Sequence, residues 1–410
     1  MPGPLEGVKV VDFSRVLAGP LCGRTLLELG AEVIKIEPPS VDVSRFSTPA
    51  RPGMSGYYAQ QNAGKRNISI DLNKAGARDI ALRLCDRADV VVENFRAGTL
   101  DSFGLGYADL SARNPQLIYA SITGYGQHGP WRSRSAYAPT VQAEAGLTAN
   151  SARHYGSALA TPHTDSLSHA DVYAGLQATV AILAALHRRT QTGIGQHIDI
   201  AMAAALLSVN ERAHLDLSED DAGDEPAALG ATESPFFRGP GGEHFTVATS
   251  LVWSGSFPGW LRAMRRPDLA TDPRFATASA RRLNIQALRE IIQAWIHTFP
   301  DKAALDAQFD EAKIAFGEVR TLRELAGTEW AKRWGAVREV SDRHGGAYRL
   351  PGAPWRFSGD ALPDLGDPAF RGEDNAAITQ SIGYSAEEIQ AFVEGGVLVA
   401  DRSLAQRHGS

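Results

Sequence analysis

The chain has 410 residues, of which 43% are hydrophobic and 21% are charged, and both values are ordinary for a globular protein. Its formal net charge of -6 argues against a nucleic-acid partner, which would need a basic face. A chain of this length usually exceeds what one hydrophobic core supports, so we expect two domains.

The first 200 residues alternate short apolar runs with helical segments, which is typical of an open α/β sheet. Val8–Phe13 and Val33–Ile36 are predicted strands on either side of a helix over Leu21–Leu29, which Gly30 ends. These three segments form one βαβ unit. Three more predicted strands and one helix follow, namely Ile68–Leu72, Val90–Val92 and Leu117–Ser121, with the helix over Ala75–Asp86.

The stretch His163–Leu186 is rich in small and apolar residues that recur at helix spacing. We expect a closely packed helix that starts near Gly175, with Asp171 just before it. An acid near a helix start is most often a favourable charge for the helix dipole. The alternative is a nucleophile, because an aspartate with a pKa of about 4 is already ionised at neutral pH and needs no base beside it. Taken alone, Asp171 favours the first interpretation.

The second half begins with an acidic stretch rich in Gly and Pro, which predicts a solvated linker over residues 215–233. A smaller α+β domain over residues 234–334 is expected next, with a strand at Phe245–Thr249 and amphipathic helices such as Leu283–Phe299. Residues 345–372 are loop-rich, and a capping signal at Ser385 begins a last helix over Tyr384–Glu394. Residues 1–214 and 335–410 would together form a large Rossmann-like domain.

Polar and aromatic residues follow the predicted strand that ends near Glu93. Ligands bind at the carboxyl ends of strands in open α/β sheets. Asn94 is suited to bond a ligand amide, Phe95 to pack on a flat group and Arg96 to meet a phosphate. A plain strand-to-helix turn with Phe95 in the core fits the same residues equally well.

Two other segments also carry two interpretations. Lys65 would suit a phosphate-bearing ligand, although a solvated surface pair with Arg66 is the default interpretation. Gly239, Gly241 and Gly242 indicate a hairpin turn or, alternatively, a mobile lid over a water-sensitive intermediate.

The first turn lacks the three glycines of a nicotinamide fingerprint, so that cofactor is not indicated. The two cysteines have no pairing or metal spacing and the 11 histidines have no helix-face metal spacing, so we expect no metal and a reducing cytoplasm. No signal peptide is evident and no apolar run is taken to reach membrane-spanning length, so no membrane partner is expected.

Taken together, the motifs resemble the class III CoA-transferase family of the CaiB/BaiF type. This family includes formyl-CoA and carnitine CoA-transferases and, more distantly, α-methylacyl-CoA racemases. The likeness extends over nearly the whole chain, in the family's order. The matching segments are LEGVKVVDFSRVLAGPLCGRTLLELGAEVIKIEPP, NAGKRNISIDL, ENFRAG with GLGY after it, LIYASITGYGQHGP, HADVYAGLQATVAILAAL and RPDLATDPRF.

The resemblance implies a reaction that moves CoA from an acyl-CoA to a free carboxylic acid. The family's catalytic aspartate falls on Asp171, which would form aspartyl anhydride and thioester intermediates. By the same resemblance, the residues expected at the CoA site are Val16, Leu17, Lys65, Leu72, Asn94, Phe95, Arg96, Phe103 and Tyr137. The glycine loop would cover the anhydride against water.

The same resemblance implies that coenzyme A is a substrate rather than a resident cofactor, and that the protein forms an interlocked homodimer. The donor and acceptor acids cannot be identified from the sequence. Racemases of this superfamily pair the aspartate with a histidine, but this chain has Tyr137 at the histidine's position. Tyrosine, with a pKa of about 10, is a poor base at neutral pH, which favours transfer. A racemase and a non-catalytic CoA-binding protein stay as alternatives.

Overall fold

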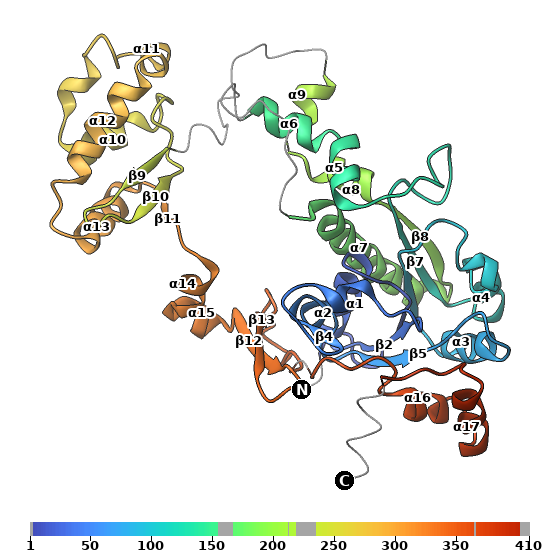
Figure 1. The fold of residues 1–410 in the computed structure, drawn as a ribbon. Helices are drawn as coiled ribbons and strands as arrows, with labels where there is room; N and C mark the ends of the chain where they lie inside the picture. The colour runs from blue at the N-terminus through green and yellow to red at the C-terminus, as the bar shows by residue number, and fades with distance from the viewer. Residues whose placement is uncertain (1–2, 155–166, 212, 219–234, 365, 402–410) are drawn as a thin grey trace. The chain divides into compact units, whose positions relative to one another are not determined.

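The computed structural model describes residues 3–154, 167–211, 213–218, 235–364 and 366–401. The chain divides into two compact units (Figure 1). Unit 1 comprises Met1–Thr148, Thr164–Glu211 and Glu329–Ser410. Unit 2 comprises Ala149–His163 and Arg212–Thr328, of which 155–163, 212 and 219–234 lie outside the described residues. Most of the expected linker therefore lies outside them, and unit 1 resumes earlier than the expected residue 335.

Unit 1 is built on a six-stranded sheet in which every pairing is parallel. Its hydrogen-bonded order is β5-β2-β1-β6-β7-β8. The strands are β1 (Lys9–Asp12), β2 (Glu32–Glu37), β5 (Arg66–Ser69), β6 (Val90–Glu93), β7 (Ile118–Thr123) and β8 (Gln196–Ala201). The strand order reverses between β1 and β6, and ligands of such sheets bind outside the carboxyl ends of the strands at that point. The expected α/β fold with an open parallel sheet is confirmed.

Helices cover both faces of this sheet because alternate strand residues point to opposite sides. Val10 and Val90 belong to one core with α1 (Ala18–Glu28) and α7 (His169–Thr192), whereas their neighbours Val11 and Val91 belong to a second core. The second core includes α3 (Ala77–Asp86), α4 (Tyr107–Arg113), α16 (Asn375–Ser381) and α17 (Ala386–Glu394). In Figure 1 the last two helices, in red, lie beside the blue part of the chain. The C-terminal residues thus complete the domain that the N-terminal residues begin.

The remaining elements of unit 1 are short. They are α2 (Gly56–Asn62), α5 (Ala138–Glu144), α8 (Met202–Val209), α15 (Glu329–Trp334) and two antiparallel hairpins, β3 (Ala50–Arg51) with β4 (Met54–Ser55) and β12 (Val337–Ser341) with β13 (Ala347–Pro351). Helix α6 (Leu147–His154) straddles the division between the units.

Unit 2 has a three-stranded antiparallel sheet with helices packed around one core. Its elements are α9 (Ala213–Leu217), β9 (Phe236–Arg238), β10 (His244–Val247), α10 (Phe257–Met264), α11 (Ala278–Leu283), α12 (Ile285–Ile296), α13 (Lys302–Ala312), β11 (Phe316–Glu318) and α14 (Leu322–Gly327). The helix expected over Leu283–Phe299 is α12, which begins at Ile285 and ends at Ile296; Leu283 is the last residue of α11.

Helix α7 corrects two expectations. It begins at His169, not near Gly175, so Asp171 lies within its first turn. It is also long and apolar enough to cross a membrane by length and composition alone, contrary to the expectation that no such run exists. In the structure, Ala174, Ala178 and Ile182 are buried in the core that α7 forms with the sheet.

Candidate active site

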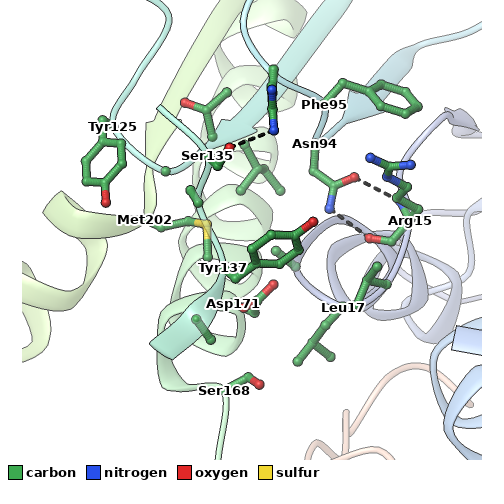
Figure 2. Close-up of a pocket in the computed structure, with 18 of the residues that line it drawn as sticks. Arg15, Leu17, Asn94, Phe95, Tyr125, Ser135, Tyr137, Ser168, Asp171 and Met202 are labelled. Carbon is green, nitrogen blue, oxygen red and sulfur yellow. Dashed lines mark hydrogen bonds between the residues drawn. The ribbon is translucent and has the colours of Figure 1, made fainter. Parts of the chain in front are cut away.

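A cavity of about 260 Å³ opens at the carboxyl ends of β1, β6 and β7. Its walls come from segments that are far apart in the sequence. They are residues 15–18 after β1, residues 94–96 after β6, residues 122–125 at the end of β7, residues 132 and 134–139, and the single residues Tyr57, Ser168, Asp171 and Met202. In Figure 2 the side chains of Asp171, Leu17 and Tyr137 lie together in this cavity. The cavity thus lies at the edge of the sheet where ligands of this fold bind.

The carboxylate of Asp171 lies where two helices begin. Asp171 is in the first turn of α7, and it accepts a hydrogen bond from the backbone N–H of Ala18, the first residue of α1. Backbone amides at a helix start carry partial positive charge, so both helices favour an anion here. Among the described residues no Lys, Arg or His forms an ion pair with Asp171. Its negative charge is therefore held by amides and stays available to a substrate.

Burial is the main influence on the pKa of Asp171 and raises it to about 6. The hydrogen bonds from the N–H groups of Ala18 and of Asp171 itself oppose that rise. At neutral pH most of the carboxylate is still ionised. The carboxylate is therefore ionised as expected, although its pKa is higher than that of a free aspartate, and its role as a nucleophile stays a prediction.

The close approach of α7 to α1 depends on a glycine. Gly175 lies one turn after Asp171, and a Cβ built on it would be 2.5 Å from the carbonyl oxygen of Ala18. No side chain larger than hydrogen fits there without moving α1. Glycine is intrinsically poor in a helix interior, so its presence here is explained by packing.

Asn94 holds the loop between β1 and α1. Its Oδ1 accepts a hydrogen bond from the N–H of Arg15, and its Nδ2 donates one to the carbonyl oxygen of Arg15, both at 2.8 Å (Figure 2). This pair of bonds crosses from β6 to β1, the point at which the strand order reverses. We expected Asn94 to bond a ligand amide, but in the structure both of its polar atoms bond the protein.

A second cavity of about 420 Å³ adjoins the first. Its lining is mostly apolar and includes Leu72, Phe95 and Phe103. Arg15 and Phe95 line both cavities, and the guanidinium carbon of Arg15 lies 5.5 Å from the centroid of the Phe95 ring. A long ligand can therefore occupy both cavities and pass the Arg15–Phe95 pair.

Most of the residues predicted from the sequence line one of these two cavities. The first is lined by Val16, Leu17, Asn94, Phe95, Arg96, Tyr137 and Asp171, and the second by Leu72, Phe95 and Phe103. Phe95 packs against the second core and also lines both cavities, so the structure does not decide between the two interpretations of its segment.

Lys65 lines neither cavity, which corrects the expectation that it meets a phosphate or lies on the surface. Its ammonium is buried and donates to Asp12 Oδ2 at 2.8 Å, to the carbonyl oxygen of Pro20 at 2.9 Å and to Asn62 Oδ1 at 3.0 Å. Since an ammonium has three hydrogens, none is left for a ligand. Lys65 instead joins the end of β1 to α1.

The glycines at 239, 241 and 242 belong to unit 2, where they form the turn between β9 and β10. The N–H of Gly239 donates to the carbonyl oxygen of Glu243 at 2.8 Å, and the N–H of Gly242 to that of Gly239 at 3.0 Å. The hairpin-turn interpretation is confirmed. The role of a lid stays a prediction.

Sequence reasoning predicted Arg96 but missed Tyr57, Arg15, Arg132 and Arg134, which also line the first cavity. Burial, followed by the charges of Asp171 and Asp42, raises the pKa of Tyr57 to about 12, so its hydroxyl keeps its proton. Arg15, Arg96 and Arg132 have no carboxylate partner among the described residues. Arg15 and Arg132 come from two separate loops and no local motif marks them, although the repeated Arg-Ser of residues 132–135 is visible. Together they make this cavity suited to an anionic ligand.

The family model described as CoA-transferase family III matches residues 5–375. The chain belongs to this family. It is 37% identical over 301 residues to a probable fatty acyl-CoA transferase of Mycobacterium tuberculosis, covering 70% of this chain and 75% of the relative. It is also 30% identical over 421 residues to the formyl-CoA:oxalate CoA-transferase of Escherichia coli O157:H7, covering 96% of this chain and 99% of the relative.

A third relative is the succinyl-CoA:mesaconate CoA-transferase of Haloarcula hispanica, 34% identical over 313 residues that cover 74% of this chain and 78% of the relative. Among solved structures, a CaiB/BaiF family protein from Brucella suis matches with a TM-score of 0.78 and 32% identity, over 93% of this chain and 100% of that one. As a family III member with these relatives, the protein is a CoA-transferase enzyme, and the family's substrates are CoA thioesters.

Proposed function

We propose that the protein transfers CoA from an acyl-CoA to a free carboxylic acid through covalent intermediates on Asp171. The observation that carries this proposal is the state of that carboxylate. It is mostly ionised at neutral pH and is held by the N–H of Ala18; it faces a cavity, and no cation of the described residues is bonded to it. A carboxylate of this kind attacks an activated acyl group directly, with no base to remove a proton.

The proposed reaction has four steps. Asp171 attacks the thioester carbonyl, the C–S bond breaks, and a mixed anhydride and CoA thiolate result. The thiolate attacks the aspartyl carbonyl and releases the first acid, which leaves an aspartyl-CoA thioester. The carboxylate of the second acid displaces the thiolate to form a new anhydride. The thiolate then attacks the new acyl carbon and restores the free Asp171 carboxylate. No proton is gained or lost over the cycle.

The two cavities suit the two ends of coenzyme A. The apolar second cavity, with Leu72, Phe95 and Phe103, would take the adenine, because aromatic side chains stack on flat rings. The pantetheine arm would pass Arg15 and reach Asp171 in the first cavity. Arg15, Arg96 and Arg132, which have no carboxylate partner among the described residues, would meet the phosphates or the carboxylate of the second acid. Coenzyme A would thus bind as a substrate, and the interlocked homodimer and the glycine lid stay predictions.

Replacing the nucleophile tests this proposal. A panel of acyl-CoA donors and free acids, analysed by mass spectrometry, should give a pair that the wild type exchanges. Asp171→Asn should reduce that exchange by about a thousandfold or more, because the intermediates cannot form. Its affinity for CoA should change little. Glu373→Gln is the matched control, since Glu373 is a partly buried carboxylate that lines neither cavity.

Three results would contradict the proposal. Substantial exchange by Asp171→Asn would show that Asp171 is not the nucleophile. Deuterium uptake at the α-carbon of an acyl-CoA, without transfer to a second acid, would indicate a racemase. Binding of CoA with no exchange across the panel would indicate a non-catalytic protein.

A further inference from the structure

Two valines near the candidate active site have left-handed backbone conformations. The φ angle is 68° at Val16 and 62° at Val41. Residues branched at Cβ rarely adopt this conformation, because Cβ crowds the neighbouring backbone. It persists only where the surrounding structure holds it. Hydrogen bonds connect the two segments: the N–H of Val16 donates to the carboxylate of Asp42, the residue that follows Val41.

The side chain of Asp42 is buried, and its oxygens bond several partners at once. The N–H of Val16 lies 3.2 Å from Oδ1 and 3.1 Å from Oδ2. Oδ1 also accepts from the N–H and hydroxyl of Ser44, at 3.0 and 2.8 Å. Oδ2 lies 3.3 Å from the ammonium of Lys35. These bonds lower the pKa of Asp42 in opposition to its burial, so the group is a fixed anion.

The same cluster also holds the residues before Val16. Lys35 Nζ donates to the carbonyl oxygen of Ser14 at 2.6 Å. Asn94 bonds both the N–H and the carbonyl oxygen of Arg15. The backbone from Ser14 to Val16 is therefore held by side chains from other segments. A buried ion pair is weak evidence for a gain in stability. Bonds from that pair to the loop backbone point instead to control of the loop's shape.

Val16 lies two positions before Ala18, whose N–H bonds the carboxylate of Asp171. Leu17 is the N-cap residue, and Ala18 begins α1. A rotation about φ of Val16 would redirect both of the following peptide groups. We propose that Asp42 is a positioning residue: it holds Val16 in its left-handed conformation and thereby aims the N–H of Ala18 at the carboxylate of Asp171. This inference rests on the proposed role of Asp171 as nucleophile.

The test is a double-mutant cycle between Asp42 and Val16. Glycine has no Cβ and adopts positive φ freely, so Val16→Gly removes the need for Asp42 to hold the backbone. Asp42→Asn should lower kcat about tenfold or more when Val16 is present, as expected for a lost hydrogen bond to a charged group. In the background of Val16→Gly the same substitution should lower kcat less than about threefold. A merely structural role predicts equal losses in both backgrounds.

A second readout needs no substrate. The pKa of Asp171 can be followed by infrared titration of its carboxyl group, with Asp171→Asn as the blank. Loss of the Ala18 bond removes a stabiliser of the ionised form, so Asp42→Asn should raise this pKa, and Val16→Gly should reverse most of the rise. Because this readout works without turnover, a failure of the proposed transferase reaction leaves the positioning role testable.

Glu28→Gln is the control for the cycle. Glu28 is a buried carboxylate paired with Arg24 at the far end of α1, so its effect should not depend on residue 16. If Asp42→Asn does not fold, Asp42→Glu keeps the charge for Lys35 and displaces the acceptor by one methylene. An unchanged pKa of Asp171 together with equal losses of kcat in both backgrounds would overturn the proposal.

Discussion

At the scale of single residues, the pKa of Asp171 connects the fold to the chemistry. The pKa rises from its ordinary value of 3.8 to about 6, chiefly because the carboxyl group is buried. Between these two values the folded protein binds a proton that the unfolded chain releases. Stability therefore falls as the pH rises through this interval, and above it the ionised carboxylate destabilises the fold.

Two measurements follow from that pKa. For the wild type, log kcat should rise with unit slope up to about pH 6 and level off above it, because only the ionised form attacks.

At pH 7.5, Asp171→Asn should be more stable to urea by about 1–3 kcal/mol, since it removes a buried charge. The difference should disappear below about pH 4. An acid limb near pH 4, or a mutant less stable at pH 7.5, would show that the site does not raise this pKa.

Residue type alone did not predict that Arg96 lines the first cavity whereas Lys65 is buried in bonds to the protein. Both are bases beside predicted strands, and both were expected to meet phosphates. Lys65 has no hydrogen left for a ligand because Asp12, Pro20 and Asn62 accept all three. The guanidinium of Arg96 instead lines the first cavity and, among the described residues, donates one hydrogen bond, to Ser135 Oγ at 2.6 Å. The difference lies in partners that are distant in sequence, which no local pattern contains.

At the scale of elements, α7 and α1 together make the site. Asp171 depends on both helix starts, and the distance between them depends on Gly175. The small residues of α7 were visible in the sequence and predicted close packing. Its start was placed too late because a capping signal was overlooked: Ser168, a favoured N-cap residue, stands three positions before Asp171, although its side chain makes no capping bond in the structure.

Replacing Gly175 should disturb the site without touching any reacting atom. In Gly175→Ala the new methyl group would be 2.5 Å from the carbonyl oxygen of Ala18, so α1 must shift. We expect a loss of about 1–3 kcal/mol in stability, as for overpacking, and a kcat lowered about tenfold or more.

Gly259→Ala in α10 is the matched control for this change. Gly259 is also helical, but its Cβ would meet only the end of the Arg262 side chain, at 3.8 Å. Alanine should therefore stabilise the protein by about 0.5–1 kcal/mol there and leave kcat unchanged. A similar gain in stability at position 175 would show that the two helices do not need the glycine.

Elements with a strong apolar pattern were predicted well, and elements without one were not. β1, β2, β6 and β7 were all found within a few residues of their expected positions. β8 was missed, because its sequence QHIDIA has polar residues among the apolar ones and its strand forms the edge of the sheet. The β12–β13 hairpin was also missed, since part of it lies in a stretch read as loop.

At the scale of the whole molecule, the order of the strands places the chemistry. The reversal between β1 and β6 brings the loop after β1 beside Asn94, and the two cavities meet there at Arg15 and Phe95. Alternating strands and helices predicted the class of fold. Three features of the site could not be predicted in this way: the contact between the two cavities, the hydrogen bonds that hold the backbone of residues 14–16, and the placement of Arg15, Arg96 and Arg132. They depend on distances between strands, which only the folded chain defines.

The central claim is that Asp171 becomes acylated during each turnover. An acceptor acid labelled with ¹⁸O in its carboxylate tests this most directly, because the proposed steps leave one of its oxygens on the aspartate. After a single turnover, mass spectrometry of the peptide that contains Asp171 should show one ¹⁸O atom in that side chain, and none when either substrate is omitted. Complete transfer with an unlabelled Asp171 would contradict the account.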